Sequence, residues 1–145
     1  MLGRMSHKVV YFKIKYKIDI NKIVGFIRST KNLFQLIDGR CLLSQTQILS
    51  AISRAGRRYI KGSRVNNEGI LILMFVSAST QIDSAISSCG LKPDSSTAAL
   101  IYDDESDYSN FIAKFPEFVM VDPFVPYDVK DDSIFEKMSY VDATL

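Results

Sequence analysis

The sequence predicts a single α/β domain in which a mixed β-sheet is flanked by α-helices. Segments with a period of two alternate along the chain with segments whose apolar residues recur every three to four positions, as strands and helices do. The length of 145 residues suits one domain with a sizeable core. A hydrophobic fraction of 47% argues against a disordered chain. The prediction is therefore one domain over residues 1–145.

The first half of the chain is expected to contain two strands and two helices. Residues 9–16 alternate apolar and basic side chains, which predicts a half-buried strand. Asp19 can cap a short helix, and residues 33–37 form a second strand. Ser44 begins a capping box and opens the longest helix, which Gly62 ends.

The second half begins with a run, residues 70–76, that is apolar at every position. Such a run predicts a central strand covered on both faces. Ser79 or Thr80 is expected to cap the helix that follows. That helix is expected over residues 80–89, and the remaining predicted elements are a strand over 97–102, a helix over 108–115, an edge strand over 118–121 and a C-terminal helix over 134–140.

Charge is divided unequally between the two halves. Residues 1–64 hold 14 basic and 2 acidic residues, a net charge of +12, whereas residues 65–145 hold 4 basic and 14 acidic residues, a net charge of −10. A chain divided in this way can present a positive face that attracts nucleic acid. The alternative is that the charges intermix on folding and cancel.

No catalytic pattern is visible. The sequence lacks a nucleophile elbow, a phosphate-binding loop and a dinucleotide fingerprint. His7, the only histidine, is expected in a frayed N-terminus, and with Cys41 and Cys89 it cannot complete a zinc site unless carboxylates join them. The cysteines are expected to be reduced, buried thiols. The acidic residues at 103–107 are expected to form a solvated turn rather than a cation site. No catalytic residue, metal or cofactor is predicted.

The longest apolar run is far shorter than the roughly 20 residues that span a bilayer, and no signal peptide opens the chain. The sequence therefore predicts a soluble, cytoplasmic protein that makes no membrane contact.

A basic stripe on the longest helix is the strongest local signal. It consists of cations at helical spacing, followed by one more beyond the helix: Arg54, Arg57, Arg58, Lys61 and Arg64. Like charges in this pattern oppose each other unless an anion offsets them, and guanidinium groups can fork onto phosphate oxygens. The stripe predicts a face that binds phosphates, such as those of nucleic acid, and Tyr59 on the same helix is expected to pack inward. The alternatives are an ordinary solvated face, or a phosphate-binding face formed by Lys13, Lys15 and Lys17.

The predicted helix over residues 80–89 shows the opposite property, because Asp83 is its only charged residue. Depletion of charge is typical of the core of a protein interface. We therefore predict a partner-binding surface around Gln81, Ile82 and Ala85. The alternative is that the C-terminal segment of the chain covers this helix.

The order and spacing of several short motifs resemble one known family. They are Leu33–Asp38, Gln47–Ala51, Gln81–Ile82 with Ala85–Ile86, Gly90–Leu91 and the closing Ile134–Met138. The chain resembles the small accessory subunit of the KEOPS complex, the TPRKB-like family that binds the Bud-type atypical kinase. The likeness covers about half of the chain well and its ends loosely. Gln47 stands where archaeal members often have histidine.

The resemblance implies a non-catalytic subunit that docks on the small lobe of the kinase. It also implies that the protein engages the single-stranded 3′ CCA end of tRNA, which the complex modifies to threonylcarbamoyladenosine beside the anticodon. Two other functions compete with this one. The first is a small α/β enzyme acting on an anionic metabolite, and the second is a module whose charged halves pack head to tail with copies of itself.

Overall fold

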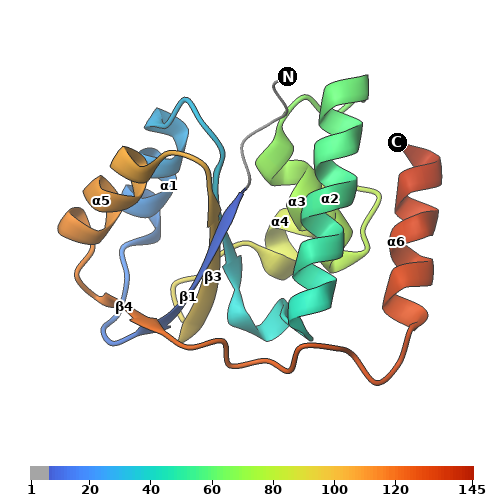
Figure 1. The fold of residues 1–145 in the computed structure, drawn as a ribbon. Coiled ribbons are helices and arrows are strands. Elements are labelled where there is room, and N and C mark those ends of the chain that lie inside the picture. The colour runs from blue at the N-terminus through green and yellow to red at the C-terminus, as the bar shows by residue number, and fades with distance from the viewer. Residues whose placement is uncertain (1–6) are drawn as a thin grey trace.

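The computed structural model describes residues 7–145. A four-stranded sheet in the order β2-β3-β1-β4 lies at its centre (Figure 1). The strands are β1 (Lys8–Ile14), β2 (Phe34–Asp38), β3 (Thr97–Tyr102) and β4 (Phe118–Val121). The predicted single α/β domain is confirmed, but the sheet is not mixed, since every neighbouring pair of strands is antiparallel.

Helices cover both faces of the sheet (Figure 1). Helices α1 (Ile20–Ser29) and α5 (Glu105–Lys114) lie on one face, over an aromatic core that includes Phe12, Phe34 and Phe111. The other face carries α2 (Gln45–Lys61), α3 (Glu68–Ser77), α4 (Ile82–Cys89) and α6 (Ser133–Thr144), over an aliphatic core. The alternation of side chains along the strands produces these two cores, because successive residues point to opposite faces.

The segment 70–76 is helix α3 and not the predicted central strand. The Asn67 side chain accepts a hydrogen bond from the backbone N–H of Ile70 at 3.0 Å, which begins the helix, and Ala78 closes it with φ of 54°. Helix α3 packs between the sheet and three other helices, so it is apolar all round. A short, fully apolar run has no periodicity and fits a buried helix as well as a buried strand.

The predicted helix starts are confirmed in part. Asp19 caps α1, and Ser44 Oγ accepts a hydrogen bond from Gln47 N–H at 3.0 Å. The capping box is incomplete, because Gln47 Oε1 accepts from Leu43 N–H at 2.6 Å instead of reaching back to Ser44. Helix α4 has Gln81 at its N-cap without a side-chain hydrogen bond, so neither predicted cap is correct.

The prediction of reduced cysteines is wrong, because Cys41 and Cys89 form a disulfide. It joins the short helix η1 (Gly39–Cys41) to the end of α4 across a sequence separation of 48 residues. Closing a loop of this length stabilises the fold by roughly 4 kcal/mol in the chain-entropy model. The sequence could not show this pairing, since only the packing of α4 on α3 brings the two residues together.

Within the described part of the chain, no single helix is long and apolar enough to cross a membrane. Helices α3 and α4 meet that test only as a pair, by length and composition, and are bent by 72° at the break between them.

Candidate partner-binding surfaces

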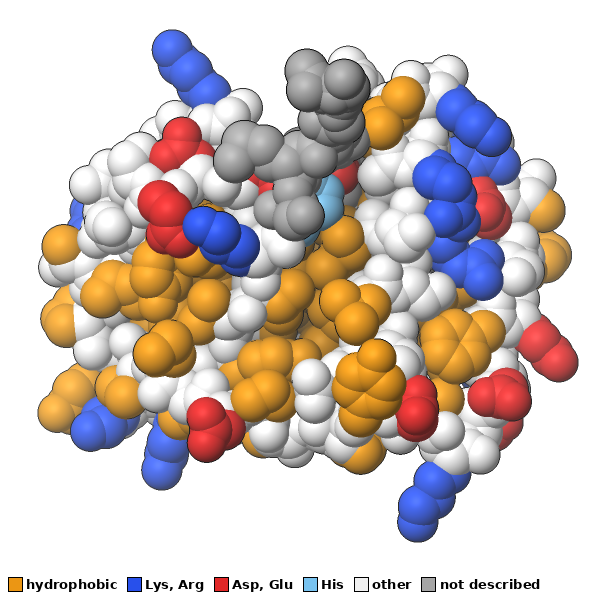
Figure 2. All heavy atoms as spheres, viewed as in Figure 1, with side chains coloured by type: hydrophobic (Ala, Val, Ile, Leu, Met, Phe, Trp, Pro, Cys, Tyr) orange, Lys and Arg blue, Asp and Glu red, His pale blue; other side chains and the backbone are white. Residues whose placement is uncertain are grey.

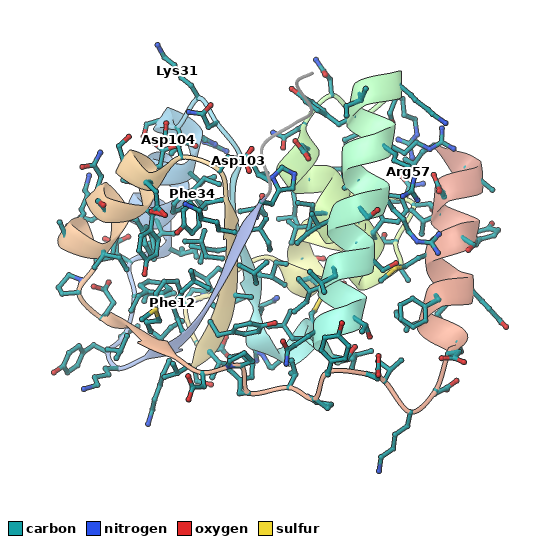
Figure 3. All side chains as sticks on the ribbon, in the orientation of Figure 1. Phe12, Lys31, Phe34, Arg57, Asp103 and Asp104 are labelled. Atoms are coloured by element: carbon teal, nitrogen blue, oxygen red, sulfur yellow. A yellow bond between two sulfur atoms is a disulfide. The ribbon has the colours of Figure 1, made fainter. Side chains whose placement is uncertain are left out.

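The basic stripe of α2 is only partly open to solvent. Arg57, Lys61 and Arg64 are exposed, whereas Arg54 and Arg58 are half-buried. Arg57 Nη1 donates to Ser53 Oγ at 2.8 Å, one turn earlier on the same helix. Figure 2 shows blue side chains gathered on the side of the molecule where α2 and α6 lie, and Figure 3 labels Arg57 there. The predicted stripe therefore exists, although its cations differ in their surroundings.

Helix α6 engages two of these cations. Arg58 Nε donates to Asp142 Oδ1 at 2.5 Å, and its Nη2 donates to the Asp142 carbonyl at 2.5 Å. Arg54 Nη1 donates to Ser139 Oγ at 3.2 Å. Arg64 Nη2 donates to the Thr80 carbonyl at 2.6 Å, which ties the end of α2 to the loop before α4. Arg57 and Lys61 are the exposed cations of α2, and neither makes an ion pair with residues 7–145.

Basic residues of the first half meet acidic residues of the second at several points of the described chain. The charges therefore intermix in part, and the two halves do not form wholly separate faces. The pairs are Lys8 with Glu105 at 2.7 Å, Arg40 with Asp94 at 3.0 Å and Arg58 with Asp142 at 2.5 Å.

A groove of about 570 Å³ lies at the β2 edge of the sheet, between α1, α3 and α4. Its rim carries two cations and three amide side chains from segments far apart in the sequence: Arg28, Lys31, Asn32, Asn66 and Asn67. Figure 3 shows Lys31 projecting outward near the loop that follows α1. Tyr59 of α2 also lines the groove and is 41% exposed, so the expectation that it packs inward is wrong. This groove combines positive charge, hydrogen-bonding amides and an aromatic ring.

Helix α4 exposes two large apolar side chains among otherwise polar residues. Ile82 is 36% exposed and Ile86, one turn later, is 44% exposed. Gln81 is exposed at the start of the helix, but Ala85 is fully buried against the core and cannot contact a partner, which corrects its predicted role. The alternative of cover by the C-terminal segment does not hold, because α6 packs on α2 and α3 and both isoleucines remain accessible.

His7 is not in a frayed terminus. Its Nε2 lies 2.9 Å from Glu68 Oε2, and its Nδ1 contacts Asp103 Oδ1, so it ties the start of β1 to α3 and to the end of β3. The hydrogen bond with Glu68 raises the pKa of His7, and Asp103 adds to this, although burial opposes them. The His7 and Glu68 side chains are only 9% and 7% exposed, so this ion pair is largely buried.

Protonated His7 is expected to stabilise the fold. Its pKa in the folded protein is raised above the ordinary 6.5, so the stabilisation is complete below that value and is lost as the pH rises through the raised pKa. The difference in free energy of unfolding between wild type and His7→Gln should therefore shrink from about pH 5 to about pH 9 in urea titrations. A difference that stays constant over this range would contradict the assignment.

The acidic residues at 103–107 hold local structure, as a turn and helix start would. Asp104 caps α5 by accepting from Ser106 N–H at 2.8 Å, and Glu105 accepts from Lys8 Nζ at 2.7 Å. No group of three or more potential ligands that could hold a metal ion is present within residues 7–145.

Comparison with known protein families identifies one family that the chain matches. A family model described as "Kinase binding protein CGI-121" matches residues 13–136, from within β1 to within α6. No individually curated protein matches the chain. The family match covers most of the chain and confirms the resemblance found in the sequence motifs. The chain therefore belongs to the CGI-121 family of kinase-binding proteins.

Proposed function

We propose that this protein is a non-catalytic accessory subunit of the KEOPS complex. It binds the atypical Bud-type kinase and recruits tRNA through the 3′ CCA end, for threonylcarbamoyladenosine modification beside the anticodon. The observation that carries the proposal is the exposed apolar face of α4 in a chain that belongs to a kinase-binding family.

The kinase contact is assigned to the face of α4. Ile82 and Ile86 lie one helical turn apart and form a small apolar surface, while Gln81 supplies a polar group at its margin. Apolar anchors with few charges around them are what a desolvated interface core requires. The disulfide at Cys89 fixes the end of this helix to η1, which presents the surface in one orientation.

The RNA contact is assigned to the open part of the α2 stripe together with the groove beside β2. Arg57 and Lys61 offer charge for phosphates, and the groove adds Arg28 and Lys31. Recognition of unstacked bases also needs an aromatic surface and hydrogen-bonding groups. Tyr59 provides the ring, and the amides at the rim provide donors and acceptors.

The competing function is a small enzyme acting on an anionic metabolite, and it needs an acid–base pair open to the groove. Glu68 lines the groove, but it is paired with His7 and its side chain is almost fully buried. The groove thus offers cations and amides for binding rather than groups for proton transfer.

The other competing function is a module that packs head to tail with copies of itself. Such a module needs separate positive and negative faces, and the ion pairs between the two halves of the chain reduce that separation.

Binding of intact tRNA is expected to exceed binding of the same tRNA without its 3′ CCA nucleotides by about tenfold or more, because even one base stacked on Tyr59 is worth about 1–3 kcal/mol. Fluorescence anisotropy with labelled total tRNA, before and after enzymatic removal of the 3′ end, measures this ratio. Equal affinity for the two preparations would remove the 3′ end from the proposal and leave phosphate contacts alone.

A further inference from the structure

Strand β1 extends beyond its neighbour at one edge of the sheet. Its pairing with β3 begins at Lys8, opposite Tyr102. Its pairing with β4 begins only at Tyr11, opposite Val121, where β4 ends. Within the part of the chain that the structure describes, residues 8–10 therefore have a strand on one side only, at the opposite edge of the sheet from the groove beside β2.

The backbone groups of Val9 point to this open side. Lys15 N–H donates to the Glu117 carbonyl on the β4 side, and Ile14 N–H donates to the Ser96 carbonyl on the β3 side. Because the direction alternates along a strand, odd-numbered residues of β1 direct their N–H and C=O groups towards β4. The residue that would continue the ladder opposite Val9 is Pro123, which has no N–H to donate.

The chain after β4 leaves the sheet and opens a groove beside this edge. It turns to the start of α2, where Gln45 N–H donates to the Pro126 carbonyl at 2.9 Å. The resulting groove has a volume of about 720 Å³, and Figure 2 shows a hollow with orange side chains in the middle of this face. Its walls include Ile48 and Leu49 of α2 and Met120 and Val121 of β4.

Among residues 7–145, one charged side chain lines the groove. Asp122 is exposed and forms no ion pair with residues 7–145. The cation nearest along β1, Lys8, is already paired with Glu105. The described walls thus form a largely apolar channel, and the carboxylate at its margin pairs with no cation among residues 7–145. Such a channel complements a peptide that carries both apolar and basic side chains.

We propose that an extended segment of a partner protein adds to β1 at residues 8–10, in line with β4. Its backbone pairs with the N–H and C=O groups of Val9, an apolar side chain enters the groove against Leu49, and a Lys or Arg meets Asp122. Three strand residues span about 10 Å, so the ladder is short and the groove side chains supply much of the specificity.

The geometry is tested first by amide hydrogen exchange in the free protein. The amide of Val10 points to β3 and should be protected, whereas the amide of Val9 should exchange rapidly. Addition of a blocked hexapeptide of alternating valine and lysine should slow exchange at Val9. An amide of Val9 that is already protected in the monomer, or that the peptide leaves unchanged, would overturn the proposal.

The chemistry is tested by titrating the same peptide into groove variants. Asp122→Lys should weaken binding about tenfold, and Leu49→Glu should abolish it. Asp128→Lys makes the same charge change at an exposed position outside the groove lining and should have no effect. Equal loss in all three variants would show non-specific charge attraction and refute the site. A concentration-dependent dimer in sedimentation that Leu49→Glu dissolves would assign the edge to a second copy and refute the partner peptide.

Discussion

Ile82→Glu is expected to abolish binding of the Bud-type kinase while the free protein stays folded. Ile82 is 36% exposed, so the carboxylate can remain hydrated in the free protein. In the complex the same carboxylate would be buried without a partner, which costs about 3–5 kcal/mol and lowers affinity at least 100-fold. Calorimetric titration with the purified kinase measures the loss, and thermal unfolding by circular dichroism checks the fold.

Variants on the same helix provide matched controls. Ile86→Glu should reproduce the loss, because Ile86 shares the exposed face. Ser84→Glu introduces the same charge at an exposed position on the opposite side of the helix from both isoleucines and should bind normally. Ala85→Glu should instead unfold the protein, since Ala85 is fully buried. Binding of the folded Ile82→Glu variant at the wild-type level would place the kinase contact elsewhere.

The elements predicted best are those whose sequence pattern fits either a strand or a helix but not both. Residues 97–102 and 118–121 are strands with the predicted bounds, and Pro123 correctly marks the end of β4. The run at 70–76 failed because uniform burial removes the periodicity that separates a helix from a strand. The capping role of Asn67, visible in the sequence, was the local signal that favours a helix there.

The exposure of the predicted binding residues was correct where it depends on helical spacing alone, and wrong where it depends on packing between elements far apart in the sequence. Helical spacing placed Arg57 and Lys61 on one exposed face of α2. It could not show that α6 would return to hold Arg58 through Asp142, some 84 residues later. Spacing also put Ala85 in the same stripe as Ile82, although packing on α3 buries one and exposes the other. The groove beside β2 had no sequence signal, because its residues come from several separate segments.

Charge reversal at the two open cations of α2, Arg57→Glu with Lys61→Glu, is expected to remove most tRNA binding. Arg58 is left unchanged, because a glutamate there would face Asp142 and loosen α6, so that loss of fold and loss of binding could not be separated. Reversal at exposed positions costs little stability.

The salt dependence of the remaining binding identifies the kind of contact that was lost. Each phosphate contact on a single strand contributes a slope of about −0.7, so loss of two contacts should make the slope shallower by about 1.4. Filter binding at several salt concentrations measures it. Lys15→Glu with Lys17→Glu makes the same charge change at exposed positions after β1 and serves as the control. If this control loses binding and the α2 variant keeps it, the RNA face lies at β1.

If the α2 variant alone loses binding, Tyr59→Ala should then reduce the preference for an intact 3′ end without changing the salt slope, because a stacking ring contributes no charge.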